Sequence, residues 1–170
     1  LVAIQAFLSA NDDHVLLLSP SSAFIAHPYA YDKLSYDPRD LSPVARISST
    51  LISISVPPSL NVNSLKELFA MARAQPGTLN WASTTGATDL ILLSYIKKSG
   101  LDMVRVPYRN PVEALTDTVK GHVHLYWAAH AIVQAQVQAG TVKVIAIANS
   151  EPTSLLPGVP TVTQAGYPDL

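Results

Sequence analysis

The regular alternation of helical and strand patterns after Ser64 constrains the fold more than any other feature of the chain. Apolar runs of strand length lie at residues 78–82, 103–106, 123–127 and 142–148, and stretches typical of helices lie at residues 87–98 and 129–139. Strands that recur roughly every 20–25 residues with helices between them specify βαβ units and a parallel sheet. The sequence therefore predicts an α/β fold.

Two of the helices carry strong start signals. Ser64 and Glu67 form a capping box, in which the serine hydroxyl and the glutamate each satisfy a backbone N–H that lacks a helical partner. Asn110 is placed as the N-cap of a later helix, with Pro111 at its first position and Glu113 at its third. These signals predict where both helices begin.

The chain before Ser64 is less regular. Residues 1–10 have the apolar spacing of a helix, and residues 14–18 form a short apolar run that predicts a strand. Residues 23–31 predict a short helix that breaks near Pro28. Residues 44–56 are rich in β-branched side chains and predict one long strand.

Composition excludes several classes of protein. A net charge of −1 over 170 residues argues against a large nucleic-acid surface. The chain has no cysteine, which excludes disulfides, thiolate metal sites and a cysteine nucleophile. The longest unbroken apolar runs, such as residues 68–72, have five residues, whereas a membrane-spanning helix needs about 20. Only 14% of residues are charged and 48% are apolar, so we expect chain outside this sequence or a partner to cover part of the surface.

Ligands of open α/β sheets bind outside the carboxyl ends of the strands. This rule selects the loops at residues 19–22, 83–88, 107–110 and 128–130. The second of these, Ser83-Thr84-Thr85-Gly86-Ala87-Thr88, joins a strand to a helix and is made of small and hydroxyl residues. Backbone N–H groups at a helix start can hold an anion without any lysine. The alternative is that Thr85 or Thr88 simply caps the helix, and Asp89 in the first turn argues against an anion there.

Two further positions could contact a ligand. Tyr108 and Arg109 follow a strand, and the arginine fork could pair with a carboxylate, although an exposed arginine near a helix start needs no ligand. Trp127 could stack on a ligand, but packing at the end of the sheet is the favoured interpretation.

Enzymatic and metal sites have weaker support. The loop at residues 83–88 has neither the Gly-x-Ser-x-Gly elbow nor the Gly-x-x-x-x-Gly-Lys phosphate loop. His122, His124 and His130 could be imagined around a metal, but no carboxylate is placed with them. A triad of Ser83, His130 and Asp89 can be drawn, as in most chains of this length. We therefore predict no catalytic residue, no metal and no cofactor.

Seven segments, in order along nearly the whole chain, resemble one protein family. Its motifs "DGYTLLL", "KLPYDPxxDFxPV", "SVKEL", "NPGKLNYAS", "VPYKG", "ALTDLLGG" and "LPDVPTVAEAG" are similar to the segments that begin at Asp13, Lys33, Ser64, Gln75, Val106, Ala114 and Leu156. The family is the extracytoplasmic solute-binding receptors of tripartite tricarboxylate transporters, also called the Bug or TctC family.

The resemblance implies a two-lobed binding protein of the type II periplasmic class, with one doubly wound parallel lobe and part of a second lobe. Residues 1–50 would belong to the first lobe and 51–148 to the second, with hinge strands near 44–56 and 142–148, and 149–170 would return toward the first lobe. It implies a periplasmic protein, monomeric at full length, that binds a small organic carboxylate and delivers it to membrane permease subunits without covalent chemistry.

The resemblance also implies which residues bind the solute. The loop at 83–88 corresponds to the carboxylate loop of the second lobe, whereas the family's first-lobe loop has no counterpart in this sequence. From the rule on strand ends we expect Ser21 and Ser22 to contribute from the first lobe. Where the family has "FDN", this chain has Trp127, Ala128 and Ala129, which lack the usual aspartate acceptor. That departure disfavours a solute with an ammonium group and favours a less polar acid.

Two other classes stay open at this point. One is the effector domain of a transcription regulator, which can share this topology but would need a basic helix-turn-helix segment upstream. The other is an enzyme that binds a phosphate or acyl ester at the hydroxyl-rich loop, and Ser83→Ala would abolish its turnover.

Overall fold

The computed structural model describes residues 2–84 and 86–170, and it divides into two compact units, Leu1–Ser48 and Ser49–Leu170. Each unit is described by itself. Among the described residues, none of the helices combines the length and the apolar character that crossing a membrane requires.

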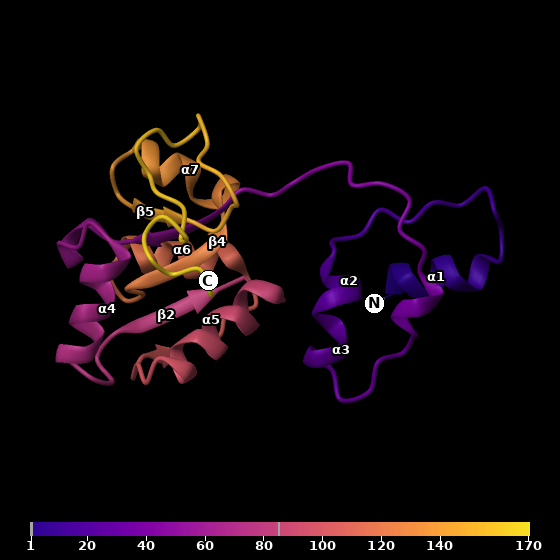
Figure 1. The fold of residues 1–170 in the computed structure, drawn as a ribbon, viewed down its shortest axis with the longest axis horizontal. Coiled ribbons are helices and arrows are strands. Elements are labelled where there is room, and N and C mark those ends of the chain that lie inside the picture. The colour runs from indigo at the N-terminus through magenta and orange to yellow at the C-terminus, as the bar shows by residue number, and fades with distance from the viewer. Residues whose placement is uncertain (1, 85) are drawn as a thin grey trace. The chain divides into compact units, whose positions relative to one another are not determined.

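The second unit is built on a five-stranded sheet (Figure 1), in the order β3-β2-β4-β1-β5. The strands are β1 (Ile52–Val56), β2 (Asn80–Ser83), β3 (Val104–Arg105), β4 (Leu125–Ala129) and β5 (Lys143–Ile147). The predicted strands from residue 78 onward are therefore confirmed to within two residues at each end. The predicted strand at 44–56 is wrong for its first part, because only Ile52–Val56 pairs with neighbouring strands.

The sheet is mixed and not wholly parallel. β2 runs parallel to β3 and to β4, but β1 is antiparallel to both of its neighbours, β4 and β5. Four strands therefore point the same way, and β1 lies between β4 and β5 in the opposite direction. The expectation of a parallel sheet came from helices that separate the strands. A helix, α4, also separates β1 from β2, but β1 does not pair with β2 and is instead inserted antiparallel between β4 and β5.

Helices cover both faces of this sheet, as in a doubly wound fold. The helices of the second unit are α4 (Leu65–Ala74), α5 (Ala87–Lys98), α6 (Pro111–Val119) and α7 (His130–Gln138), and η2 (Pro58–Leu60) is a single 3₁₀ turn. In β4, Leu125 and Trp127 face the core under α4 and α5, whereas Tyr126 and Ala128 face the core under α6 and α7. This two-residue alternation places apolar side chains on both faces of a buried strand.

The helix start signals act as predicted, with one difference. Ser64 Oγ accepts a hydrogen bond from the Glu67 N–H at 3.2 Å, and Asn110 Oδ1 accepts one from the Val112 N–H at 3.0 Å. The Glu67 carboxylate reaches back to the N–H of Asn63 at 2.7 Å instead of that of Ser64. The capping interaction is therefore present but displaced by one residue.

Residues 149–170, which we expected to return toward the first lobe, pack on the second unit. Thr161 forms a parallel bridge with Ile147, and the Val162 N–H donates to the Ile147 carbonyl at 2.8 Å. Tyr167 meets Phe69 of α4 edge to face, with ring centroids 5.1 Å apart. The segment thus extends the core under α4 and α5.

The first unit contains α1 (Val2–Ala10), α2 (Ser22–Ile25), α3 (His27–Ala30) and the 3₁₀ turn η1 (Pro38–Asp40). A small apolar core joins α1 and α2 to the segment at residues 34–41, and the Tyr36 hydroxyl donates to the Ala23 carbonyl at 2.7 Å. The predicted helix at 23–31 is two short helices that break at Ala26, and Pro28 lies in the first turn of the second one. The predicted strand at 14–18 is wrong, because the described residues of this unit offer no strand to pair with it.

Candidate functional site

The carboxyl ends of β2, β3, β4 and β5 meet at one edge of the sheet, because these four strands run in the same direction. The start of β1 joins the same edge, where the Leu51 carbonyl accepts the His130 N–H at 2.8 Å. The predicted loops at 83–88 and 107–110 belong to this edge. Residues 128–130 do not form a loop, because β4 ends at Ala129 and α7 begins at His130.

The turn from β2 to α5 has the geometry expected of an anion-binding corner. Gly86 precedes the helix with φ +113° and ψ −143°, a conformation that only glycine adopts easily. The N–H groups of Ala87 and Thr88 have no acceptor among the residues that the structure describes, and both residues are half-buried. The start of α5 therefore presents two backbone donors at the positive end of the helix dipole.

The hydroxyl groups of this turn are partly engaged within the protein. Thr88 Oγ1 donates to the Thr84 carbonyl at 2.8 Å and lies 3.3 Å from Thr84 Oγ1, while the Thr84 N–H donates to the Trp127 carbonyl at 3.1 Å. Thr88 does not cap α5, because it is the second residue of the helix, Gly86 is the N-cap, and no side-chain capping hydrogen bond forms there. Thr85, the other predicted binding or capping residue here, lies outside the described residues.

Asp89 forms an ion pair that the sequence did not predict. Its carboxylate accepts from Arg105 Nη2 at 2.7 Å and Nε at 3.1 Å, and from Ser83 Oγ at 2.8 Å. Ser83 therefore uses its only hydroxyl hydrogen on Asp89 and can act toward a ligand only as an acceptor in this arrangement. The sequence held only a weak indication of this ion pair, because Arg105 lies sixteen residues after Asp89 with no spacing rule that joins an edge strand to the first turn of α5.

Tyr108 and Arg109 differ sharply in environment. The Tyr108 hydroxyl donates to Asp117 Oδ2 of α6 at 2.8 Å, and burial together with this hydrogen bond raises the pKa of Tyr108 to about 12. Arg109 is exposed and has no ion pair among the residues that the structure describes. Of this pair, only Arg109 has hydrogen-bond donors available to a solute carboxylate.

Trp127 and Ala128 are 1% and 0% exposed, and both are core residues in this structure. Trp127 packs under α4 and α5, where its Nε1–H has no acceptor among the described residues. Ala128 lies opposite Ser53 of β1 and packs under α6 and α7. The packing interpretation of Trp127 agrees with its burial, and neither residue offers accessible surface to a solute here.

Ser21 and Ser22 lie in the first unit, at the start of the four-residue helix α2. Ser21 is exposed and its carbonyl accepts the Phe24 N–H at 2.9 Å, without a side-chain cap. Ser22 is half-buried. Their hydroxyl groups therefore remain candidates for the first-lobe contact.

The three histidines of the second unit have separate environments. His124 Nδ1 accepts the Asn80 N–H at 2.8 Å, and burial lowers the pKa of His124. Burial also lowers the pKa of His130, whose Nδ1 has no partner among the described residues. His122 is exposed, with Nδ1 3.7 Å from Asp117 Oδ1.

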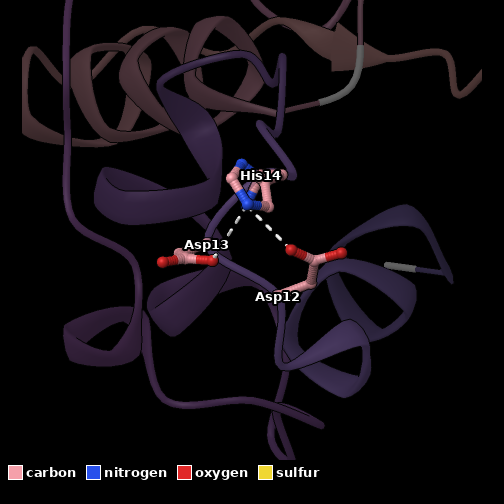
Figure 2. Close-up of side chains that lie close together, drawn as sticks. All are labelled: Asp12, Asp13 and His14. Carbon is pink, nitrogen blue, oxygen red and sulfur yellow. Dashed lines mark hydrogen bonds and ion pairs between the residues drawn. The ribbon is translucent and has the colours of Figure 1, made fainter.

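Within the described residues, one group has the spacing of a metal site, namely Asp12, Asp13 and His14 of the first unit (Figure 2). All three are exposed, the His14 N–H donates to Asp12 Oδ1 at 2.9 Å, and His14 Nε2 lies 3.8 Å from Asp13 Oδ1. These contacts are those of an acidic turn at the surface.

Comparison with known proteins gives consistent results. The family model described as "Tripartite tricarboxylate transporter family receptor" matches residues 1–170. Protein BugT of Bordetella pertussis is 28% identical over 165 residues, which cover 95% of this chain and 51% of BugT. The chain thus spans about half the length of the curated relatives that it matches.

Solved structures share the fold. A structure titled as a periplasmic transporter has a TM-score of 0.72 at 28% identity, and covers 87% of this chain and 49% of its own. An R. palustris protein solved with adipate has a TM-score of 0.71 at 30% identity, over 81% of this chain and 47% of its own. The fold is therefore that of the periplasmic binding proteins, as the resemblance implied. With the family model matching the whole sequence, this chain belongs to the receptor family of the tripartite tricarboxylate transporters, a family of solute-binding receptors and not of enzymes.

Proposed function

We propose that this chain forms part of a periplasmic receptor that holds a small organic carboxylate at the start of α5 and delivers it to membrane permease subunits. The observation that carries the proposal is the pair of N–H groups of Ala87 and Thr88, which have no acceptor among the described residues and lie at the carboxyl edge of the sheet. The similar R. palustris protein was solved with adipate, a dicarboxylate.

Binding would use no covalent step. One carboxylate would accept from the N–H groups of Ala87 and Thr88 and from the hydroxyl of Thr84, where the helix dipole adds roughly half a positive charge. A second carboxylate would pair with the exposed guanidinium of Arg109. Tyr108 would hold the 107–110 loop in place through its hydrogen bond to Asp117.

Ser21 and Ser22 of the first unit would contribute hydroxyl groups to solute binding. Residues 44–56 would serve as a hinge, since the division between the two units falls within them. The strand at 142–148 would be a second hinge only if chain beyond residue 170 leads back to the first lobe, because residues 149–170 pack on the second unit. Closure would exclude water and strengthen the charge-assisted hydrogen bonds. Ala128 stands where the family has its usual aspartate, so the solute would be an acid without an ammonium group.

A binding assay on the full-length product of the gene that encodes this chain tests the proposal. We expect adipate or a dicarboxylate of similar length to raise the melting temperature, with saturation confirmed by isothermal titration calorimetry. Adipamide, which has the same length and no charge, should produce no shift. An equal response to adipamide or to neutral sugars would contradict the proposal.

A proline at the first position of α5 tests the donor directly. Ala87→Pro removes one N–H at a position where proline fits a helix, so the fold should be retained. We expect the affinity for the dicarboxylate to fall about tenfold or more, since a charge-assisted hydrogen bond is lost. Ala87→Ser keeps the N–H and is the matched control, which should bind as the wild type does. Unchanged binding by Ala87→Pro would place the anion elsewhere.

A further inference from the structure

Asp89 is the feature of the second unit that most opposes an anion at the start of α5. It is the third residue of the helix, and its side chain is only 15% exposed. A carboxylate in the first turn interacts favourably with the helix dipole and repels a second negative charge nearby. Without compensation, Asp89 would compete with any carboxylate solute.

Arg105 of β3 neutralises the charge of Asp89. Its guanidinium binds Asp89 through both Nε and Nη2, a two-pronged arrangement that fixes orientation as well as charge. The guanidinium carbon also lies 6.0 Å from the ring centre of Trp81, the residue that pairs with Arg105 in the β2–β3 register. Trp81 is 1% exposed, so the ring forms a fixed support for the arginine.

A separate observation concerns the strand next to β2, which carries a buried donor without a partner. Trp127 pairs with Ser83 in the β2–β4 register, so both side chains lie on the face that α5 covers. The indole Nε1–H is buried and has no acceptor among the residues that the structure describes. A buried donor without a protein partner favours an acceptor such as a negative group or an ordered water.

We propose that Arg105 is a positioning residue of the solute site, which neutralises Asp89 so that the N–H groups at the start of α5 can hold a carboxylate. The inference rests on the proposed function and deepens it. It names a residue outside the binding loop that allows a negatively charged solute to bind next to the negative charge of Asp89. Arg105 need not touch the solute, and its effect is transmitted through Asp89 and Ser83.

A double-mutant cycle on the full-length protein tests the inference, with adipate as the probe. Arg105→Met removes the positive charge and leaves Asp89 uncompensated within about one helical turn of the bound carboxylate. We expect it to lower the adipate affinity about tenfold at low ionic strength, and less in high salt. Arg105→Met combined with Asp89→Asn should restore the affinity to within about threefold of the wild type, because both charges are gone.

Two controls separate this role from a purely structural one. Arg73→Met removes an exposed arginine of α4 and should leave the adipate affinity unchanged. Arg105→Lys keeps the charge without the fork, and it should recover most of the binding that Arg105→Met loses. Melting temperatures of the unliganded variants show whether the fold is intact, and a structural role would leave the double variant as weak as Arg105→Met.

The outcomes distinguish this inference from the function on which it rests. If the wild type binds adipate and Arg105→Met binds it equally well, the role of Arg105 is refuted and the proposed function stands. A double variant that binds no better than Arg105→Met also refutes it. If the wild type responds to no dicarboxylate, both the proposed function and this inference fail.

Discussion

Replacing Tyr108 by phenylalanine distinguishes a role as solute ligand from a structural role in holding the 107–110 loop. The sequence places Tyr108 at the ligand edge, whereas in the structure its hydroxyl donates to Asp117 Oδ2 at 2.8 Å. A hydrogen bond to a charged acceptor contributes about 1.5–3 kcal/mol, but the Asp117 side chain is 33% exposed and water can replace the lost donor. We therefore expect Tyr108→Phe to lower the free energy of unfolding by about 1 kcal/mol, or about 2–4 °C in melting temperature.

The stability difference between the wild type and Tyr108→Phe should depend on pH above 10. The pKa of Tyr108 is raised to about 12, so the folded state holds this proton more tightly than the unfolded state does. The stabilisation is complete below the ordinary pKa of about 10 and is lost as the pH rises from 10 to 12. Urea denaturation of the wild type at these pH values should thus converge on that of Tyr108→Phe.

Adipate titration of Tyr108→Phe decides between the roles. Because the phenyl ring keeps its packing against the core under α6 and α7, we expect the affinity to stay within about twofold of the wild type. A tenfold loss of affinity together with an unchanged melting temperature would refute this reasoning and restore Tyr108 as a solute ligand.

Two further predictions concern the binding turn and the sheet. Gly86→Ala should lower the free energy of unfolding by about 1–3 kcal/mol through backbone strain at φ +113°. The matched control Gly100→Ala, at φ +62°, should lower it less, and because neither added methyl group meets any atom within 4 Å, the difference reflects the backbone alone. Equal losses of stability in thermal denaturation would contradict this. His124 should make the protein less stable below about pH 6.5, because burial lowers its folded pKa and the unfolded state binds the proton more strongly. His124→Asn retains an acceptor for the Asn80 N–H and should weaken the pH dependence between 7.5 and 5 in urea denaturation, the remainder arising from His130.

Local chemistry allowed much of the second unit to be predicted from the sequence. The capping residues Ser64 and Asn110 start their helices where expected, and α5 has the predicted bounds because a glycine precedes it and a glycine follows it closely. The alternation along β4 is likewise a property of neighbouring residues. Each of these features depends on interactions within one or two turns of chain.

Long-range pairing determined what the sequence could not predict. The direction of β1 follows from its insertion between β4 and β5, and residues 14–18 remain unpaired although their composition is that of a strand. A strand is stabilised by its partners, so its propensity alone does not decide whether it forms.

The candidate site shows the same division. The order of small residues at 83–88, followed by a helix, was sufficient to predict backbone donors at the start of α5. The state of each polar side chain there depends on contacts that folding creates. Asp89 accepts from both Ser83 and Arg105, and Tyr108 donates to Asp117. The sequence thus determined where backbone donors lie without helical partners, because helix ends leave N–H groups unpaired. Only the tertiary structure decided which charges surround that place, because ion pairs form between side chains that folding brings within a few ångströms.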